Sequence, residues 1–240
     1  MDKIEKLKEI LKNSKKIVCF TGAGVSTESG IKDFRGKDGI SKYTDTPIEI
    51  LISRQYYETH TKEFFDYYRK CFNCIDKEPN ITHKFIKKLE DEGKLLGVIT
   101  QNVDGLDKKA GIKNVYEIHG SIYNNHCTKC GKSYPPEAVF NTDDIPYCEC
   151  GGIIKPDVVL YGESLPIDAV MNADRIVDEA DTLIVLGTSL VVYPAAGYVD
   201  SFHGDKLVII NYDSTSYDYM ADLVINDKLS NVMNKLWYNW

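Results

Sequence analysis

The sequence contains few prolines, no repeating glycine pattern and no long apolar run. Only 8 of its 240 residues are proline, and its 17 glycines do not recur at a fixed spacing, which excludes a fibrous chain such as collagen. A hydrophobic share of 43% excludes an intrinsically disordered chain. The length fits one large domain, or one large domain with a small insertion.

Basic residues are scarce relative to acidic ones. Lysine and arginine together number 29 against 36 aspartates and glutamates, so the formal net charge is −7. Proteins that bind nucleic acid duplexes usually present a basic surface. We therefore expect no direct nucleic-acid partner.

We also expect no targeting or membrane-spanning segment. Residues 1–7 contain charges of alternating sign where a signal peptide has an apolar core. Residues 182–199 are uncharged, but Gly187, Pro194 and Gly197 interrupt them, and they fall at the lower limit of the roughly 17–25 residues that a span requires. We interpret this stretch as a buried strand, a loop and a helix start, and we expect a cytoplasmic protein without a membrane partner.

Seven cysteines are present, an odd number that does not suit a secreted disulfide framework. Four of them form two close pairs, Cys127 with Cys130 and Cys148 with Cys150. Tetrahedral zinc takes four such ligands, and the glycines after each pair allow tight turns around the sulfurs. Four protein ligands leave no open position on the metal, so the spacing predicts a structural zinc site. The alternative is four free thiols.

The other cysteines fit a structural interpretation. Cys71 and Cys74 form a second CxxC pair, but they lie in a segment with helical patterning, and no glycine turn follows them. We interpret them as half-buried thiols rather than as metal ligands or a redox couple. Cys19 lies in a predicted buried strand.

Short apolar segments alternate with helical patterns, which is typical of an α/β fold with a parallel sheet. Runs rich in valine and isoleucine suit strands that are buried on both faces. Strands are expected at 16–20, 95–100, 115–118, 183–187 and 207–211. Helices are expected at 2–13, 80–92, 166–179 and 227–238.

Two stretches interrupt this alternation. Residues 36–75 show aromatic residues at helical spacing and no convincing strand. Residues 120–155 contain the paired cysteines and little apolar periodicity. We expect both to be insertions that together build a smaller lobe.

Polar residues follow several predicted strands. Gly22-Ala23-Gly24 comes directly after the first strand and suits close approach of the backbone to a phosphate, although a plain tight turn is the alternative. Thr27 stands where a dinucleotide motif has its third glycine, which disfavours a hydride-transferring dehydrogenase. Residues 100–105, 187–189 and Asn211 follow other strands, and in a parallel sheet such ends converge. Together they suit ribose and phosphate recognition.

The chain resembles the sirtuins, which are NAD-dependent protein lysine deacylases, in an ordered set of motifs that covers nearly its whole length. These motifs are residues 22–31 (GAGVSTESGI), 33–35 (DFR), 100–106 (TQNVDGL), 119–121 (HGS), 155–163 (KPDVVLYGE), 187–190 (GTSL) and 210–211 (IN). The resemblance implies a Rossmann-like NAD-binding domain, a parallel sheet with helices on both faces, formed by residues 1–35, 76–119 and 156–240. It also implies a small domain formed by a helical insertion at 36–75 and a zinc-ribbon insertion at 120–155.

The resemblance assigns the chemistry to three residues. His119 would be the general base that activates a ribose hydroxyl, Asn102 would orient the ribose and a water, and Asp104 would help to hold the nicotinamide amide. An imidazole is neutral enough near pH 7 for this task. His119 also follows a predicted strand, close to the other polar strand ends.

The resemblance further implies NAD as a co-substrate and an acyl-lysine peptide as the second substrate. The implied NAD-binding residues are Gly22, Ala23, Gly24, Ser26, Thr27, Asp33, Phe34, Arg35, Gln101, Asn102, Val103, Asp104, His119, Gly187, Thr188, Ser189, Asn211 and Asp227. The peptide would add as a strand between two segments. These are Val159, Leu160, Tyr161, Gly162 and Glu163 on one edge and Leu190, Val191 and Val192 on the other. Ordinary core strands are the alternative for both.

Departures from the usual family pattern bear on the substrate. Members acting on succinyl or malonyl lysine show Tyr-x-x-Arg in the small-domain helix, whereas Arg69 is preceded at that spacing by Asp66. We therefore expect acetyl or longer apolar acyl groups. Lys32 replaces the usual proline before Asp33, and the second cysteine pair is C-x-C rather than C-x-x-C.

The sequence thus predicts a monomeric NAD-dependent protein lysine deacylase that releases nicotinamide and O-acyl-ADP-ribose and contains a structural zinc. One alternative is a mono-ADP-ribosyltransferase or NAD hydrolase that uses the same site. Another is a non-catalytic NAD-sensing zinc module.

Overall fold

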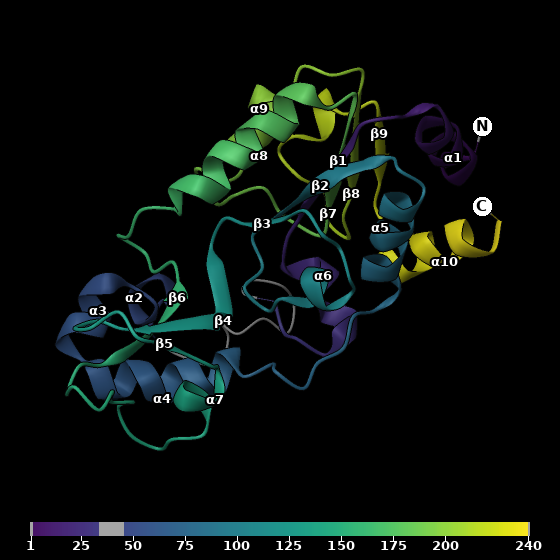
Figure 1. The fold of residues 1–240 in the computed structure, drawn as a ribbon. Helices are drawn as coiled ribbons and strands as arrows, with labels where there is room; N and C mark the ends of the chain where they lie inside the picture. Colours follow the sequence, from purple (N-terminus) through teal and green to yellow (C-terminus); the bar gives the residue numbers. More distant parts are fainter. Residues whose placement is uncertain (1, 34–45, 240) are drawn as a thin grey trace.

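A six-stranded parallel sheet forms the centre of the larger part of the molecule in the computed structural model, which describes residues 2–33 and 46–239 (Figure 1). The strand order is β3-β2-β1-β7-β8-β9. The strands are β1 (Ile17–Thr21), β2 (Leu95–Thr100), β3 (Val115–Glu117), β7 (Thr182–Leu186), β8 (Lys206–Ile210) and β9 (Leu223–Ile225). Every residue of β1 and β7 is buried, as expected for central strands that are covered on both faces.

Helices cover both faces of this sheet. Helices α1 (Lys3–Asn13), α5 (Ile81–Asp91) and α10 (Leu229–Asn239) pack on one face, and α8 (Ile167–Glu179) and α9 (Gly197–Ser201) pack on the other (Figure 1). Each face has its own apolar cluster, one around Leu7 and Phe85 and one around Phe20 and Ile176. The predicted Rossmann-like fold class is confirmed.

The expected elements are present with ends that agree to within two residues, and one strand of the parallel sheet was not predicted. The missed strand β9 has only three residues and follows a loop, so it leaves little apolar pattern in the sequence. Residues 182–199 form β7, a loop and the start of α9, as expected. In the part of the chain that the structure describes, no helix is both long enough and apolar enough to cross a bilayer.

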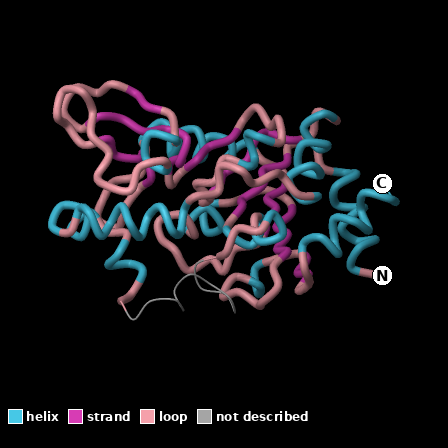
Figure 2. Tube along the Cα trace, turned by 90° about the horizontal axis from the view of Figure 1, so that it is seen from below, coloured by secondary structure: helices cyan, strands magenta, loops and turns pink. Residues whose placement is uncertain are grey.

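A second, antiparallel sheet has the strand order β5-β4-β6. Its strands are β4 (Gly120–Cys127), β5 (Ser133–Tyr134) and β6 (Ile154–Val158). They pack with helices α2 (Ile48–Leu51), α3 (Arg54–Thr59), α4 (Thr61–Phe72) and α7 (Glu137–Phe140) (Figure 1). In both views this group lies at the opposite end of the molecule from the chain termini (Figures 1 and 2).

The aromatic residues of α4 build the core of this second group. Phe64, Phe65, Tyr68 and Phe72 are buried, and Tyr68 stacks on Phe140 of α7 at a ring separation of 5.5 Å. The three antiparallel strands were not predicted, because β4 alternates irregularly between buried and exposed residues, β5 has only two residues, and β6 contains Pro156. Strand β6 crosses the proposed boundary between residues 155 and 156, so one strand connects the insertion to the segment that follows it. The division into domains at these boundaries stays a prediction.

Candidate active site

A cavity of about 1460 Å³ opens at the carboxyl ends of the parallel strands. Each of the six strands contributes residues to its lining shortly after the strand ends. These lining segments include Gly22–Gly24 after β1, Gln101–Asp104 after β2, His119 after β3, Gly187–Ser189 after β7, Asn211 after β8 and Asp227 after β9. The convergence follows from the parallel direction of the strands, which brings all their carboxyl ends to one edge.

Every described residue of the predicted NAD set lines this cavity. Phe34 and Arg35 lie outside the described residues. Of the predicted peptide residues, Val159 to Glu163 and Val192 also line the cavity. The side chain of Leu190 is instead buried in the apolar core, and that of Val191 is 55% exposed. These two residues therefore do not contribute side chains to the cavity.

The glycine turn after β1 packs directly against the turn after β7. The amide of Gly24 donates to the carbonyl of Gly187 at 2.8 Å, and Gly187 has a φ of 60°. A Cβ atom on Gly187 would come within 2.6 Å of the amide nitrogen of Val25. The segment continues as two 3₁₀ turns, η1 (Ala23–Val25) and η2 (Thr27–Ser29), and not as the long helix of a dehydrogenase motif.

Ser26, Asn102 and Asp104 connect the glycine turn to the loop after β2. The Ser26 hydroxyl donates to Oδ2 of Asp104 at 2.6 Å, and the amide of Leu106 donates to Oδ1 at 2.9 Å. The Asn102 side chain donates to the carbonyl of Gly22 at 3.0 Å. Burial raises the pKa of Asp104, while the two donors act in the opposite direction. Both loops are therefore held in one arrangement by a buried carboxyl group.

His119 is arranged to accept a proton. Its Nδ1 atom lies 3.0 Å from the carbonyl oxygen of Gln101, which can only accept a hydrogen bond. Nδ1 therefore carries the proton in the neutral ring, and Nε2 keeps its lone pair. Burial lowers the pKa of His119, partly opposed by the bond to Gln101, so the ring is neutral at pH 7.

The backbone of His119 is joined to the segment predicted to bind the peptide. The amide of Val159 donates to the His119 carbonyl at 2.9 Å. The next residue, Gly120, has a φ of 75°, and a Cβ atom there would come within 1.7 Å of the Asp157 carbonyl oxygen. Only glycine permits this approach of β4 to β6. No local sequence pattern signals this connection, since it depends on the pairing of two strands.

Only some backbone groups of the predicted 159–163 peptide edge are available to a peptide. The amide and carbonyl of Tyr161 are occupied, because Tyr161 donates to Ile52 at 3.0 Å and accepts from Arg54 at 2.9 Å. Among the described residues, the carbonyl of Val159 and the amide of Gly162 make no backbone hydrogen bond. Only part of the 159–163 edge is thus open to an added strand.

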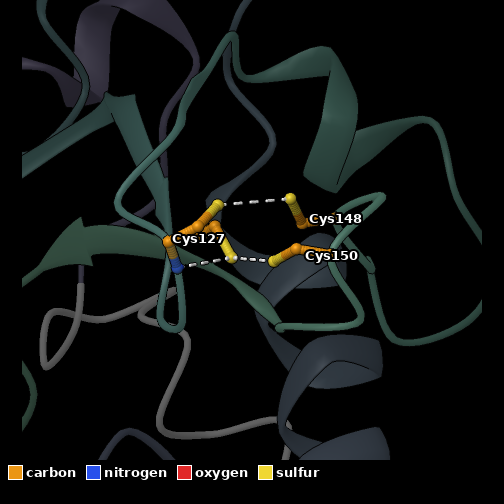
Figure 3. A group of neighbouring side chains, drawn as sticks. Cys127, Cys148 and Cys150 are labelled. Atoms are coloured by element: carbon orange, nitrogen blue, oxygen red, sulfur yellow. Dashed lines mark hydrogen bonds between the residues drawn. The ribbon is translucent and has the colours of Figure 1, made fainter.

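The four paired cysteines come together in space (Figure 3). All four sulfurs lie within 4.8 Å of one another, with Cys127 Sγ 3.4 Å from Cys150 Sγ and Cys130 Sγ 3.7 Å from Cys148 Sγ. Four sulfurs about 2.3 Å from a tetrahedral zinc ion would be about 3.8 Å apart, so the cluster fits this metal. The C-x-C spacing of the second pair fits the cluster because the chain turns after Cys148, where the amide of Gly151 donates to the Cys148 carbonyl at 2.8 Å.

Neighbouring groups stabilise thiolates in this cluster. The amides of Lys129 and Cys130 lie 3.4 and 3.5 Å from Cys127 Sγ. The Tyr134 hydroxyl donates to Cys148 Sγ at 3.0 Å, and this bond, followed by the amide of Cys150, lowers the pKa of Cys148 to about 6. Such outer contacts orient metal ligands.

Cys71 and Cys74 do not belong to the cluster, but both line the cavity. Burial raises the pKa of both thiols, that of Cys74 to about 12, which agrees with structural thiols. Ile48, Ile52 and Phe72 from the same insertion also line the cavity. Sequence reasoning missed these residues, because their approach to the strand ends depends on tertiary packing.

Comparisons with known proteins identify the family. A model described as the Sir2 family matches residues 22–194. The chain is 50% identical over 238 residues to an NAD-dependent protein deacetylase of Clostridium acetobutylicum, covering 97% of each chain. It is 48% identical over 238 residues to an NAD-dependent protein deacetylase of Staphylococcus epidermidis, covering 97% of this chain and 96% of the relative.

Solved structures show the same fold. A Sir2 structure with a deacetylated p53 peptide and 3'-O-acetyl ADP ribose matches with a TM-score of 0.90 at 36% identity, covering 98% of each chain. A Sir2 structure with a p53 peptide and NAD+ matches with a TM-score of 0.87 at 35% identity, again covering 98% of each chain. On the strength of these matches, the chain belongs to the Sir2 family, the sirtuins.

Proposed function

We propose that this protein is an NAD-dependent protein lysine deacylase, which transfers the acyl group to ADP-ribose and releases nicotinamide and O-acyl-ADP-ribose. One observation carries the proposal: a neutral His119 with its Nε2 lone pair lines the same cavity as the polar strand ends and the segment 159–163. The relatives named NAD-dependent protein deacetylase support it, as do the Sir2 structures with NAD+ or with peptide and acetyl ADP ribose.

NAD, when bound as co-substrate, supplies an electrophilic ribose carbon with nicotinamide as its leaving group. Backbone groups of Gly22–Gly24 would lie along the diphosphate, and the turn at Gly187–Ser189 with Asn211 would hold the adenosine. Gln101 donates to the Thr188 hydroxyl at 3.0 Å, which keeps two of these loops in register. The chain thus binds and orients the co-substrate before any bond changes.

His119 supplies the proton-transfer step. Nε2 would take the proton from a ribose hydroxyl, so that this oxygen can attack the acyl carbon. Asn102 would orient the ribose, while Asp104, whose two oxygens are already occupied by Ser26 and Leu106, keeps the loop that carries Val103 in place. Burial of the site strengthens these polar contacts.

Zinc has a structural role in this proposal. Cys127, Cys130, Cys148 and Cys150 would hold it with four thiolates, which leaves no position for substrate. The metal contributes folding free energy to the antiparallel sheet and takes no part in the chemistry.

The contacts of Arg69 favour uncharged acyl groups as substrates. Its guanidinium donates to Asp66 at 2.7 Å and to the carbonyl of Asp144 at 2.9 Å, and Arg69 does not line the cavity. It is therefore not placed to bind the carboxylate of a succinyl or malonyl group. Acetyl and longer apolar acyl groups need no such cation.

We also infer a monomeric cytoplasmic enzyme whose partners are acyl-lysine proteins, without a nucleic-acid or membrane partner. A thiolate zinc cluster suits a reducing compartment. The net charge of −7 supports the expectation that nucleic acid is not a partner.

Purified protein incubated with an acetyl-lysine peptide, with and without NAD, tests the proposal. We expect free lysine peptide only when NAD is present. Nicotinamide release at the same rate without any peptide would identify an NAD hydrolase or ADP-ribosyltransferase instead. NAD binding without turnover on acetyl, succinyl or long-chain acyl peptides would identify a sensing module and overturn the proposal.

A further inference from the structure

Lys155 lies beneath the turn that carries the predicted peptide edge. Its side chain extends from strand β6 and is only 13% exposed. The ammonium nitrogen lies 3.2 Å from both carboxylate oxygens of Glu163, whose side chain is 23% exposed. A lysine and a glutamate so little exposed differ from a solvated surface pair, which contributes little to stability.

The Glu163 carboxylate also holds the turn formed by residues 160–163 together. Its Oε2 atom accepts the amide of Leu160 at 2.9 Å, and the amide of Glu163 donates back to the Leu160 carbonyl at 2.9 Å. Gly162 completes the turn with a φ of 89°. Glu163 therefore directs its charge toward Lys155 and Leu160, rather than presenting it to basic residues of a substrate.

The outer side of the same turn is held by the helical insertion. Tyr161 donates to Ile52 and accepts from Arg54, so the segment before α3 pairs with the turn as a short parallel bridge. The ring of Tyr57 in α3 lies over the Lys155 ammonium, 5.8 Å from the ring centre, and the ammonium also donates to the carbonyl of Pro156 at 3.3 Å. The turn is thus clamped between β6 and α3.

We propose that Lys155 is a positioning residue for substrate binding: through Glu163 it fixes the 160–163 turn, and so sets where the open carbonyl of Val159 and the open amide of Gly162 meet an acyl-lysine peptide. This inference rests on the proposed deacylase function. Lys155 does not line the cavity, so it acts through Glu163 and not by touching a substrate. Loss of the ammonium group leaves a partly buried carboxylate without its partner, and the turn loses its fixed geometry.

Steady-state kinetics of Lys155→Gln test the proposal. We expect the KM for an acetyl-lysine peptide to rise about tenfold, the effect of one lost charged hydrogen bond, while the KM for NAD and the kcat stay close to those of the wild type. Lys155→Arg keeps the charge and should restore most of the peptide KM. Lys132→Gln is the matched control, because Lys132 pairs with Glu149 at the same 3.2 Å distance on an exposed surface.

A double-mutant cycle with Glu163→Gln separates positioning from general destabilisation. If Lys155 acts through Glu163, the double variant should have the same peptide KM as either single variant. If Lys155→Gln fails to fold, the same cycle is run with Lys155→Met, which removes the charge and keeps the apolar stem of the side chain. Multiplicative effects on peptide KM, or equal rises in the KM values for peptide and NAD, would overturn the positioning role. A wild-type protein that binds no peptide and turns over no NAD would instead overturn the proposed function itself.

Discussion

The hydrogen bond between His119 and Gln101 determines which ring nitrogen can act as a base. Nδ1 is committed to a carbonyl, so a proton arriving at His119 must go to Nε2. Burial lowers the pKa of the ring, which means that the folded protein disfavours the protonated form. The base is therefore available over the whole neutral range.

Because His119 must be neutral to act as a base, we expect activity to be lost at low pH. We expect kcat/KM for deacylation to fall with decreasing pH, with an apparent pKa below the ordinary histidine value of about 6.5. The activity is present above that pKa and lost as Nε2 is protonated. A pH–rate profile of kcat/KM measures it, and an acid limb centred above pH 7 would contradict the assignment.

Removal of the imidazole tests the same residue directly. His119→Ala should lower kcat at least about 100-fold, because proton transfer to a positioned base contributes that much. NAD binding, measured by calorimetry, should survive, since many backbone groups hold the co-substrate. His203→Ala is the control, because His203 is exposed and does not line the cavity. Full activity in His119→Ala would exclude the proposed base.

A second buried group, Asp107, makes the stability of the fold depend on pH. Asp107, in the short helix α6 (Leu106–Lys109), is 3% exposed, and burial followed by the neighbouring Asp104 raises its pKa to about 7. The unfolded value is about 3.9, so this group favours the folded state fully only below that pH. Its contribution is lost as the pH rises toward about 7.

Asp107→Asn should remove this pH dependence. Each pH unit between the two pKa values changes the free energy of unfolding by about 1.4 kcal/mol, so the variant should gain about 3 kcal/mol relative to the wild type between pH 5 and pH 8. Urea unfolding at the two pH values measures the change. If the variant and the wild type differed in free energy of unfolding by the same amount at both pH values, the raised pKa of Asp107 would be contradicted. Asp205→Asn, on an exposed loop, is the control.

Among the structural elements, the turns after β1 and β7 depend on each other. Gly187→Ala would both strain a φ of 60° and place Cβ 2.6 Å from the Val25 amide nitrogen. We expect a loss of at least about 2 kcal/mol in the free energy of unfolding, and weaker NAD binding. Gly93→Ala separates the two causes, because Gly93 has a φ of 71° and a Cβ atom added there would meet nothing within 4 Å among the described residues. Equal losses in both variants would show that backbone strain alone is responsible.

The zinc cluster, also at the scale of structural elements, stabilises the antiparallel sheet. Cys127 is the last residue of β4, Cys130 lies in the turn between β4 and β5, and the other two ligands lie in the segment before β6. Cys148→Ser should abolish bound zinc, measured by metal analysis, and lower the melting temperature. Cys71→Ser should keep its zinc, because Cys71 is not in the cluster. A zinc-free Cys148→Ser protein with unchanged stability and activity would contradict the structural role.

At the scale of the whole molecule, the sequence predicted those features that depend on patterns of neighbouring residues. The strands of the parallel sheet are short valine- and isoleucine-rich runs because both faces are buried, and the polar residues after them converge because the strands run in one direction. Of the antiparallel strands, β4 was missed because a shift of pairing register between Ser121 and Asn125 breaks its alternation. The contacts of Tyr161 with the helical insertion were also missed, since they join residues more than a hundred positions apart.

The stoichiometry of the reaction tests the central claim most directly. Quantifying nicotinamide, free lysine peptide and O-acyl-ADP-ribose from one reaction by mass spectrometry separates deacylation from every other use of NAD at this site. We predict that the three products accumulate in equal amounts and that free lysine peptide and O-acyl-ADP-ribose fall together with His119→Ala. Nicotinamide in large excess over free lysine peptide, or free lysine peptide without O-acyl-ADP-ribose, would contradict this claim.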